Sequence, residues 1–265
     1  MGLMVKILSQ SIPAELIAFG RFFFGLFAVS ILVVARLVKL KFVNRPLLIF
    51  RGIVGGFAIL CYFKSVSLIP LADAAVISFS YPIFGTIFAA IFLKEELKPQ
   101  ALLVLMIALF GMVLVADPKF RTINIGYVFA LISSLCAGAA VTSVRQLRKT
   151  DDPWSISIAQ MVGGIIIVSL LSFKSLSIPN PNILLLLVFA SLISTIGQLL
   201  LTYAYEFCSV TVGGTISLAV VPTTVVLAIV FLGETITASF LVGSSMIFGS
   251  AIYLLNSQTE AGSKG

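Results

Sequence analysis

Histidine is absent from this sequence, and charged residues make up only 10% of its 265 residues. Soluble domains carry about 25% charged residues, so the scarcity of charge excludes a water-soluble domain of this length. The three cysteines, Cys61, Cys136 and Cys208, fall inside separate apolar runs. They read as small buried apolar residues, not as a disulfide set or a metal site. We therefore expect no metal and no cofactor.

Long apolar runs make up most of the sequence. The sequence is 60% hydrophobic with a mean hydropathy of +1.17. Runs of about 20 apolar residues recur along it, and each can cross a hydrocarbon core about 30 Å thick. Since backbone groups in lipid must satisfy one another, such runs form helices. The alternating pattern of a β-barrel is absent from the sequence. The fold class predicted is an all-α polytopic membrane protein.

The apolar runs set the predicted helix boundaries. Residues 1–10 are too short to span a bilayer, and the polar residues 257–265 are predicted to form a disordered cytoplasmic tail. About nine full spans are predicted between them, at residues 16–38, 47–67, 72–93, 101–116, 127–144, 155–173, 183–205, 210–232 and 239–255.

One apolar run occurs twice. Residues 72–96 carry Pro82 in their middle and end in a charged segment, and residues 212–235 repeat this pattern around Pro222. The two prolines align when one residue is inserted. A broken apolar helix that appears in both halves of the chain predicts an internal repeat.

The repeat divides the chain into a first unit at 1–121 and a second at 122–256. With the two units aligned, Lys6 falls on Arg145, so residues 1–10 match the end of the span at 127–144. We interpret the first unit as five helices with the first largely missing, through a late start codon or a truncated chain. A genuine nine-span protein is the alternative. Five helices per unit reverse the orientation, which predicts an inverted repeat.

The basic residues indicate orientation. Most Lys and Arg residues lie in the segments 36–51, 94–98 and 145–149, which fall on the same side of the predicted bilayer. The positive-inside rule makes that side cytoplasmic, and the C-terminus then lies there too. The net charge of +7 is explained in this way without a nucleic-acid partner.

Three segments carry a resemblance to a known family. They are AFGRFFFGLFA at 18–28, RGIVGGFAILCYFKSVSLIPLADAAVISFSYPIFGTIFAAIFLKEEL at 51–97, and the stretch 231–249 that begins FLGETIT. The chain resembles the EamA family of the drug/metabolite transporter (DMT) superfamily. The resemblance implies a ten-helix inverted-repeat carrier with a central cavity, in an inner or plasma membrane, for small organic substrates. The Arg-Phe-Phe-Phe and Arg-Gly patterns also resemble S-adenosylmethionine uptake carriers.

Arg21 is the first candidate site residue because it lies inside a predicted span. An arginine at the centre of a span costs about 2.5–3.5 kcal/mol on insertion scales, so it faces a cavity or a partner. One interpretation is that its side chain binds an anionic substrate. The other is structural, with the guanidinium forming hydrogen bonds to loop carbonyl groups or to Glu15. Gln160, its repeat partner, either binds substrate or joins helices by hydrogen bonds.

Pro82 and Pro222 are predicted hinges, because each removes a backbone hydrogen bond and bends its helix. A static kink is the alternative. Polar side chains beside the two prolines are predicted to line the substrate pathway: Ser78, Tyr81, Ser217 and Thr223.

Tyr62, Gln198 and Tyr203 lie on the third helix of each half. They are predicted to line the pathway, where the rings could stack on a ring-bearing substrate. Anchoring of the tyrosines at the membrane interface is the alternative.

A secondary transporter is the predicted function. It would move an amino acid, a nucleoside-type compound or a similar polar or anionic metabolite by alternating access. The alternatives are a specific S-adenosylmethionine carrier and a truncated membrane protein without transport. An enzyme is not expected, because buried acid, histidine or cysteine constellations are absent from the sequence. The expected partners are a small-molecule substrate and the bilayer, with the chain a monomer or homodimer.

Overall fold

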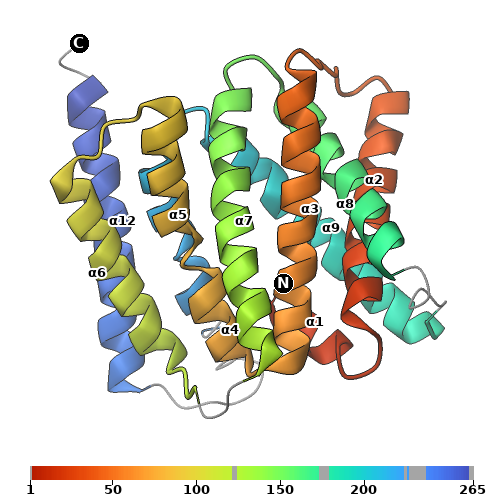
Figure 1. The fold of residues 1–265 in the computed structure, drawn as a ribbon, viewed down its shortest axis with the longest axis horizontal. Helices are drawn as coiled ribbons and strands as arrows, with labels where there is room; N and C mark the ends of the chain where they lie inside the picture. The colour runs from red at the N-terminus through yellow and green to blue at the C-terminus, as the bar shows by residue number, and fades with distance from the viewer. Residues whose placement is uncertain (1, 121–123, 173–178, 224–225, 227–236, 263–265) are drawn as a thin grey trace.

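The computed structural model describes residues 2–120, 124–172, 179–223, 226 and 237–262. All regular secondary structure in these ranges is helical (Figure 1). The elements are α1 (Gly2–Leu8), α2 (Ala14–Val34), α3 (Arg45–Leu68), α4 (Leu71–Ser78), α5 (Tyr81–Phe88), the π-helical turn η1 (Ala89–Leu93), α6 (Pro99–Ala116), α7 (Ile125–Leu147), α8 (Pro153–Ser172), α9 (Pro181–Ala204), α10 (Val210–Ser217) and α12 (Ala238–Gly262).

Eight helical segments of the described chain are long and apolar enough to cross a membrane. They coincide with eight of the nine predicted spans, with α4, α5 and η1 together forming the span Leu71–Leu93. The ninth, predicted at 210–232, begins as the shorter apolar helix Val210–Thr223. Most of the remainder of that span lies outside the described residues. The prediction of an all-α polytopic membrane protein is confirmed.

Large apolar side chains lie on the outside of the bundle. Phe27 is 61% exposed, Val34 82% and Leu170 76%. A soluble protein rarely exposes contiguous apolar surface on this scale. The bilayer supplies the apolar surroundings that these side chains require.

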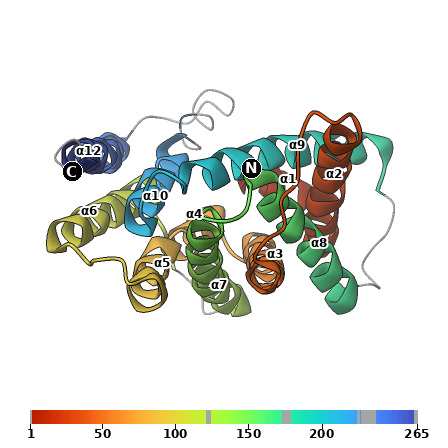
Figure 2. The same ribbon diagram turned by 90° about the horizontal axis from the view of Figure 1, so that it is seen from above.

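The two halves of the chain are interleaved. Seen from above, α9, α10 and α12 lie along one long side of the bundle, and α3, α5 and α7 lie along the other (Figure 2). Helix α7, from the second half, packs on α3, α4 and α5 of the first. Helix α2, from the first half, packs on α8 and α9 of the second. Any cavity beside these contacts is therefore built from both halves.

Glycines set how closely the helices approach. A Cβ added at Gly56 of α3 would lie 2.5 Å from the Cα of Gly164 on α8. Between α6 and α12, a Cβ at Gly111 would lie 2.7 Å from the Gly243 carbonyl oxygen, and the reverse distance is 2.5 Å. Small residues let helix backbones pack closely in membranes. These two contacts join the first half to the second.

The internal repeat is visible in matching hydrogen bonds. Lys6 Nζ on α1 donates to the carbonyl oxygens of Val66 at 2.8 Å and Ile69 at 3.0 Å. Arg145 Nη1 on α7 donates to the carbonyl oxygen of Tyr205 at 3.0 Å. Tyr205 follows Val66 at the same offset by which Arg145 follows Lys6. Helix α1 therefore has the same position relative to the end of α3 as the last turns of α7 have relative to the end of α9.

The broken helix in the first half consists of two separate helices. Helix α4 ends at Ser78, and α5 begins at Tyr81 with Pro82 in its first turn. A proline there loses no intrahelical hydrogen bond, since the first N–H groups of a helix have no partner. Helix α10 of the second half ends at Ser217. Both helices thus end at the serines that the repeat aligns.

The two broken helices are in contact. A Cβ added at Gly214 of α10 would lie 2.7 Å from the Cβ of Pro82. Further along, Thr86 Oγ1 donates to Thr211 Oγ1 at 3.0 Å. Helix α10 therefore packs along α5, beginning at the break before Pro82.

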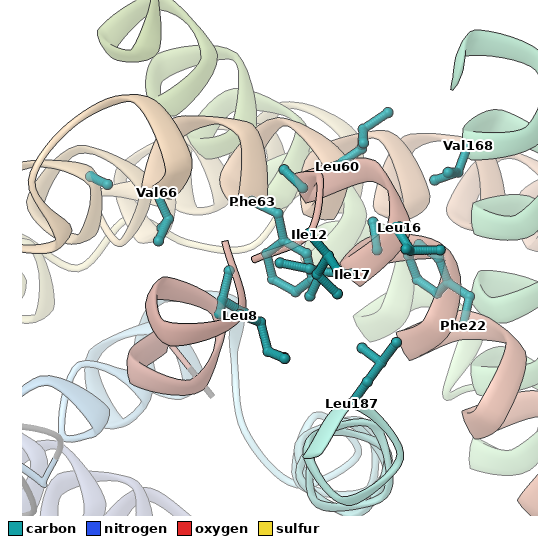
Figure 3. Packing of buried hydrophobic residues seen from close by; sticks show 14 of the residues in the cluster. Leu8, Ile12, Leu16, Ile17, Phe22, Leu60, Phe63, Val66, Val168 and Leu187 are labelled. Atoms are coloured by element: carbon teal, nitrogen blue, oxygen red, sulfur yellow. The ribbon is translucent and has the colours of Figure 1, made fainter. Parts of the chain in front are cut away.

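An apolar cluster joins α1 and α2 to the rest of the bundle. Leu8, Ile12 and Ile17 pack with Phe63 of α3 and Leu187 of α9 (Figure 3). Ile17 and Phe63 have no exposed surface. Burying a large apolar side chain contributes about 1.5–3 kcal/mol, so this cluster fixes the start of α2 against α3 and α9.

The C-terminal segment differs from the prediction. Helix α12 continues to Gly262, so residues 257–262 extend the helix instead of forming a disordered tail. No proline interrupts the helix here, and the Ser257 hydroxyl donates to the Leu254 carbonyl oxygen at 3.1 Å. Residues 263–265 lie outside the described residues.

The close approach of α3 and α8 makes a testable prediction. Gly56→Ala is expected to destabilise the protein by about 1–3 kcal/mol, because the added methyl group forces two backbones apart. Gly197→Ala is the matched control, since a Cβ there meets nothing within 4 Å. Thermal unfolding in detergent should show a lower melting temperature for Gly56→Ala alone. Equal melting temperatures for the two variants would contradict the packing.

Candidate functional site

A small cavity lies between α2 of the first half and α8 and α9 of the second. Its empty volume, including the part open to solvent, is about 220 Å³. The lining residues are Arg21, Phe22, Gln160, Met161, Ser194, Thr195 and Gln198. The cavity therefore contains a cation and several neutral polar groups within predicted membrane spans.

Arg21 reaches the cavity from α2. Its guanidinium lies over the ring of Phe63, with 5.8 Å between the Cζ atom and the ring centroid. The ion pairs formed among described residues do not include Arg21. Glu15, the carboxylate considered as its partner, pairs with Lys64 at 3.0 Å. Arg21 thus contributes a charge to the cavity that no carboxylate of the described residues neutralises.

Gln160 joins the cavity to a second arginine. Gln160 is 4% exposed, and its Oε1 accepts a hydrogen bond of 2.7 Å from Nη2 of Arg51 on α3. Arg51 is 3% exposed. Sequence reasoning counted this arginine among the cytoplasmic basic residues and missed it as a site residue. Its position inside the predicted span 47–67 was the available signal, because charge within a span is costly.

The guanidinium of Arg51 is only partly satisfied. Its Nε and Nη1 atoms are buried, and neither has a hydrogen-bond acceptor among the described residues. Gly55 makes room for the group, since a Cβ at that position would collide with Nη1 of Arg51. The missing side chain one turn along α3 lets the guanidinium lie against the helix and reach Gln160.

The far wall of the cavity is formed by α9. Thr195 Oγ1 donates to the Ser191 carbonyl oxygen at 2.9 Å, which leaves its lone pairs free to accept. Opposite it on α2, a Cβ at Gly25 would lie 2.6 Å from that hydroxyl oxygen. Gln198 forms a long hydrogen bond of 3.5 Å from Nε2 to Thr202 Oγ1. This wall offers neutral donors and acceptors.

The remaining predicted pathway residues lie elsewhere. Tyr62 packs edge-on to Phe79 at the helix break, with 6.0 Å between ring centroids. Tyr81 is buried in a different apolar cluster, together with Tyr205. Tyr203 is exposed, and the guanidinium of Arg148 lies 5.7 Å from its ring centroid. None of these tyrosines lines the cavity described above.

The predicted hydroxyl groups are also separate from the cavity. Ser78 is buried, and its hydroxyl has no partner among the described residues. The Ser217 hydroxyl donates to the Gly213 carbonyl oxygen at 2.8 Å. Thr223 is exposed and donates to the Ala219 carbonyl oxygen at 2.7 Å. Of the residues predicted from sequence, the structure gathers Arg21, Gln160 and Gln198 around one space.

A charged network connects the helix ends next to the α7–α8 loop. Arg145 Nε lies 3.2 Å from Glu95 Oε1 and forms an ion pair with it. The other Glu95 oxygen accepts from the backbone N–H of Val210 at 3.2 Å. Arg148 forms an ion pair with Glu206. The network thereby joins α7, the end of η1, and the link between α9 and α10. Glu234, which follows Glu95 at the offset of the repeat, lies outside the described residues.

The opposite end is held by Asp73. This carboxylate is fully buried and accepts from the N–H of Lys119 at 2.8 Å and the hydroxyl of Tyr127 at 2.6 Å. Lys64, which lies near Asp73 in the sequence, pairs with Glu15. Asp73 instead organises the link between α6 and α7, which connects the two halves.

Metal ligation receives no support from the geometry. Across the described ranges, no group of three or more His, Cys, Asp or Glu side chains could hold a metal ion.

Comparison with known proteins gives several relatives. The chain is 27% identical over 214 residues to the pseudopaline exporter CntI of Pseudomonas aeruginosa, covering 80% of this chain and 75% of that protein. It is 30% identical over 180 residues to human solute carrier family 35 member G1, covering 62% and 49%. It is 29% identical over 133 residues to an S-adenosylmethionine uptake transporter of Rickettsia bellii, covering 50% and 46%.

The fold and the family agree. The crystal structure of another protein superposes with a TM-score of 0.76 at 18% identity, covering 94% of this chain and 93% of that one. At this identity the likeness shows the fold alone. The model of the EamA-like transporter family matches residues 1–116 and 124–256, and the chain therefore belongs to the EamA-like transporter family.

Proposed function

We propose that this protein is a secondary transporter that moves a small polar or anionic organic metabolite by alternating access. The observation that carries the proposal is the cavity between the two halves, where Arg21 and Gln160 lie within the membrane spans. Ionisable residues inside a membrane are costly and mark substrate pathways. Relatives named as transporters and exporters support transport over catalysis.

The proposed repeat units are residues 1–121 and 122–256, with the substrate site at their interface. Inverted-repeat carriers bind substrate near the bilayer midplane between the repeats. Because α2 contacts α8 and α9, rocking of one unit against the other would open or close the cavity. A monomer contains both units, and a homodimer remains compatible with this arrangement.

The size of the cavity supports a moving structure. Small-molecule sites have volumes of roughly 300–1,000 Å³, whereas the comparable volume of this cavity is only about 10 Å³, which is roughly the space for one water molecule. A metabolite would enter only when the surrounding helices separate. Pro82 and Pro222 are the proposed hinges. Helix α5 begins beside Pro82 after the break from α4, and α10 ends at Ser217, before Pro222. Gly214 of α10 approaches Pro82 closely, so the two broken helices would move against each other.

The proposed orientation places the charged network on the cytoplasmic side of the plasma membrane. In Figure 1 the C-terminus, the α5–α6 connection and the α7–α8 connection lie at the same end of the bundle. These connections contain the basic segments 94–98 and 145–149. Under the positive-inside rule, that end is cytoplasmic, and Glu95 with Arg145 forms the contact that must open toward the cytoplasm.

The S-adenosylmethionine carrier is the alternative substrate assignment. That compound carries a sulfonium, an ammonium and a carboxylate, so its net charge is positive at neutral pH. The cavity presents Arg21, with Arg51 behind Gln160. Like charges repel strongly in a medium of low dielectric constant, which favours a neutral or anionic substrate.

Flux through reconstituted vesicles tests the proposal. Purified protein in liposomes would be offered a panel of labelled neutral, anionic and cationic metabolites. Saturable uptake that excess unlabelled compound competes away is expected for at least one class. No flux above empty liposomes across the whole panel would favour the alternative of a membrane protein without transport.

Arg21→Ala is expected to lower transport without equally lowering the amount of protein in the membrane. Losing a charge-assisted hydrogen bond to substrate costs about 1.5–3 kcal/mol, or roughly ten- to hundredfold in flux at low substrate concentration. Arg21→Lys keeps the charge and should retain part of the flux. Flux and expression would be measured on the same membranes. A parallel fall of both would indicate a structural role instead.

Glu95→Gln is expected to open the cytoplasmic end more often. Cys208 is a buried free thiol in the link that Arg145 and Glu95 hold in place. With Cys61 and Cys136 replaced by alanine, a charged maleimide should label Cys208 roughly two- to tenfold faster, because the lost pairing is worth about 0.5–1.5 kcal/mol.

Glu96→Gln is the matched control for this labelling. Glu96 is the adjacent, exposed glutamate and belongs to none of the ion pairs among described residues. In the Glu96→Gln variant, the maleimide should label Cys208 at the same rate as in the parent protein. If Glu95→Gln and Glu96→Gln label equally, the network does not control this end.

A further inference from the structure

Arg51 is a buried cation that the protein leaves partly unsatisfied. The side chain is 3% exposed, and only Nη2 has a protein acceptor, at Gln160. Nε and Nη1 are buried without an acceptor in the described part of the chain. Buried charges are normally paired, and an uncompensated one is strongly destabilising. This arrangement therefore requires an explanation beyond the packing of α3.

The described residues do not balance the positive charge at this site. The ion pairs of the described residues include neither Arg21 nor Arg51. The cavity-lining residues are Arg21 and neutral side chains, with no carboxylate among them. A bound anion would supply the missing charge.

Gln160 connects the cavity to Arg51. Its side chain lines the cavity and accepts from Arg51 at 2.7 Å. The amide oxygen of a glutamine has the position and hydrogen-bonding character of one carboxylate oxygen, without the charge. Gln160 thus occupies the acceptor position at Nη2 of Arg51, and a ligand that displaced this side chain from within the cavity would take over that position.

Resting on the transport function proposed above, we propose that the cavity takes an organic carboxylate of net negative charge. Its carboxylate pairs with the Arg51 guanidinium in place of Gln160, and Arg21 lines the same cavity. Guanidinium and carboxylate are both planar and can form two parallel charge-assisted hydrogen bonds. Gln198 and Thr195 face the same space with neutral groups, which suit a hydroxyl or a second carboxylate of the ligand.

The same charges select against other classes of substrate. A free ammonium group would find no carboxylate among the described residues that line the cavity. A net cation would meet Arg21 directly and Arg51 behind Gln160. Selection by charge is efficient here because like-charge contacts are costly when desolvated.

Gln160→Glu is the decisive variant. It places a carboxylate in hydrogen-bonding reach of Arg51 and so fills the anion position from within the protein. The full-length variant should melt higher than the parent in the absence of ligand, and it should no longer respond to added carboxylates. Gln10→Glu, at an exposed turn, makes the same chemical change outside the site and should behave as the parent.

Binding would be measured as the shift in melting temperature of detergent-purified protein, with succinate, citrate and lactate as probes. Succinamide is the neutral isostere, and sulfate and phosphate are the inorganic controls. At concentrations near 100 times the dissociation constant, a rise of about 5–10 °C is expected. Arg51→Lys keeps the charge but loses the planar donor pair, and at least a tenfold weaker response is expected.

Several outcomes would overturn the assignment. Stabilisation by succinamide or a cation but by no carboxylate would exclude an anion site. Equal shifts with sulfate, phosphate and carboxylates would exclude the organic carboxylate. A full carboxylate response in Gln160→Glu would place the anion elsewhere. Flux of neutral compounds without anion binding would overturn this inference alone, and anion binding without flux of any compound would overturn the transport function alone.

Discussion

The close approach of α3 and α8 is the contact on which the site depends. Without side chains at Gly56 and Gly164, the two backbones meet at a distance that a Cβ would not permit. Arg51 and Gln160 lie one turn away on the same two helices, and this approach brings them within 2.7 Å. Helix α3 belongs to the first half and α8 to the second. The site is therefore assembled by the same contact that packs the two halves together. A change that separates these helices would destabilise the fold and also separate the arginine from its acceptor.

The interleaving of the halves explains how a symmetric repeat produces an asymmetric cavity. Lys6 and Arg145 hold equivalent carbonyl groups in the two halves, so the repeat persists in three dimensions. The side chains at related positions differ, however, because Arg21 aligns with Gln160 across the repeat. One half therefore supplies charge to the cavity and the other supplies neutral hydrogen-bonding groups. A site that binds one substrate in one orientation needs such a difference, while the helix breaks in the two halves keep the symmetry that the proposed rocking would use.

The two ends of the bundle are closed by different interactions. Glu95 and Arg145 join helix ends on the proposed cytoplasmic side through a partly buried ion pair. Asp73 closes the other end by accepting backbone N–H groups of the connection between the halves. An ion pair is replaced by water more readily than a fully buried set of backbone contacts. The proposed transporter would therefore open first at the end held by Glu95.

The sequence by itself determined the class of the protein, the helix positions and the repeat, because hydrophobic length and the need to satisfy backbone groups in lipid act locally along the chain. It also identified Arg21 and Gln160, since polar groups within apolar runs are visible without a structure. Only the tertiary structure decided which polar residues meet. Tyr62 and Tyr203 satisfied the same sequence criterion as Gln198, yet of these three residues only Gln198 lines the cavity. Arg51 was overlooked because its place near the start of a span resembled a cytoplasmic anchor. Its burial depends on contacts between helices distant in sequence, and such contacts are set by packing, which no local pattern records.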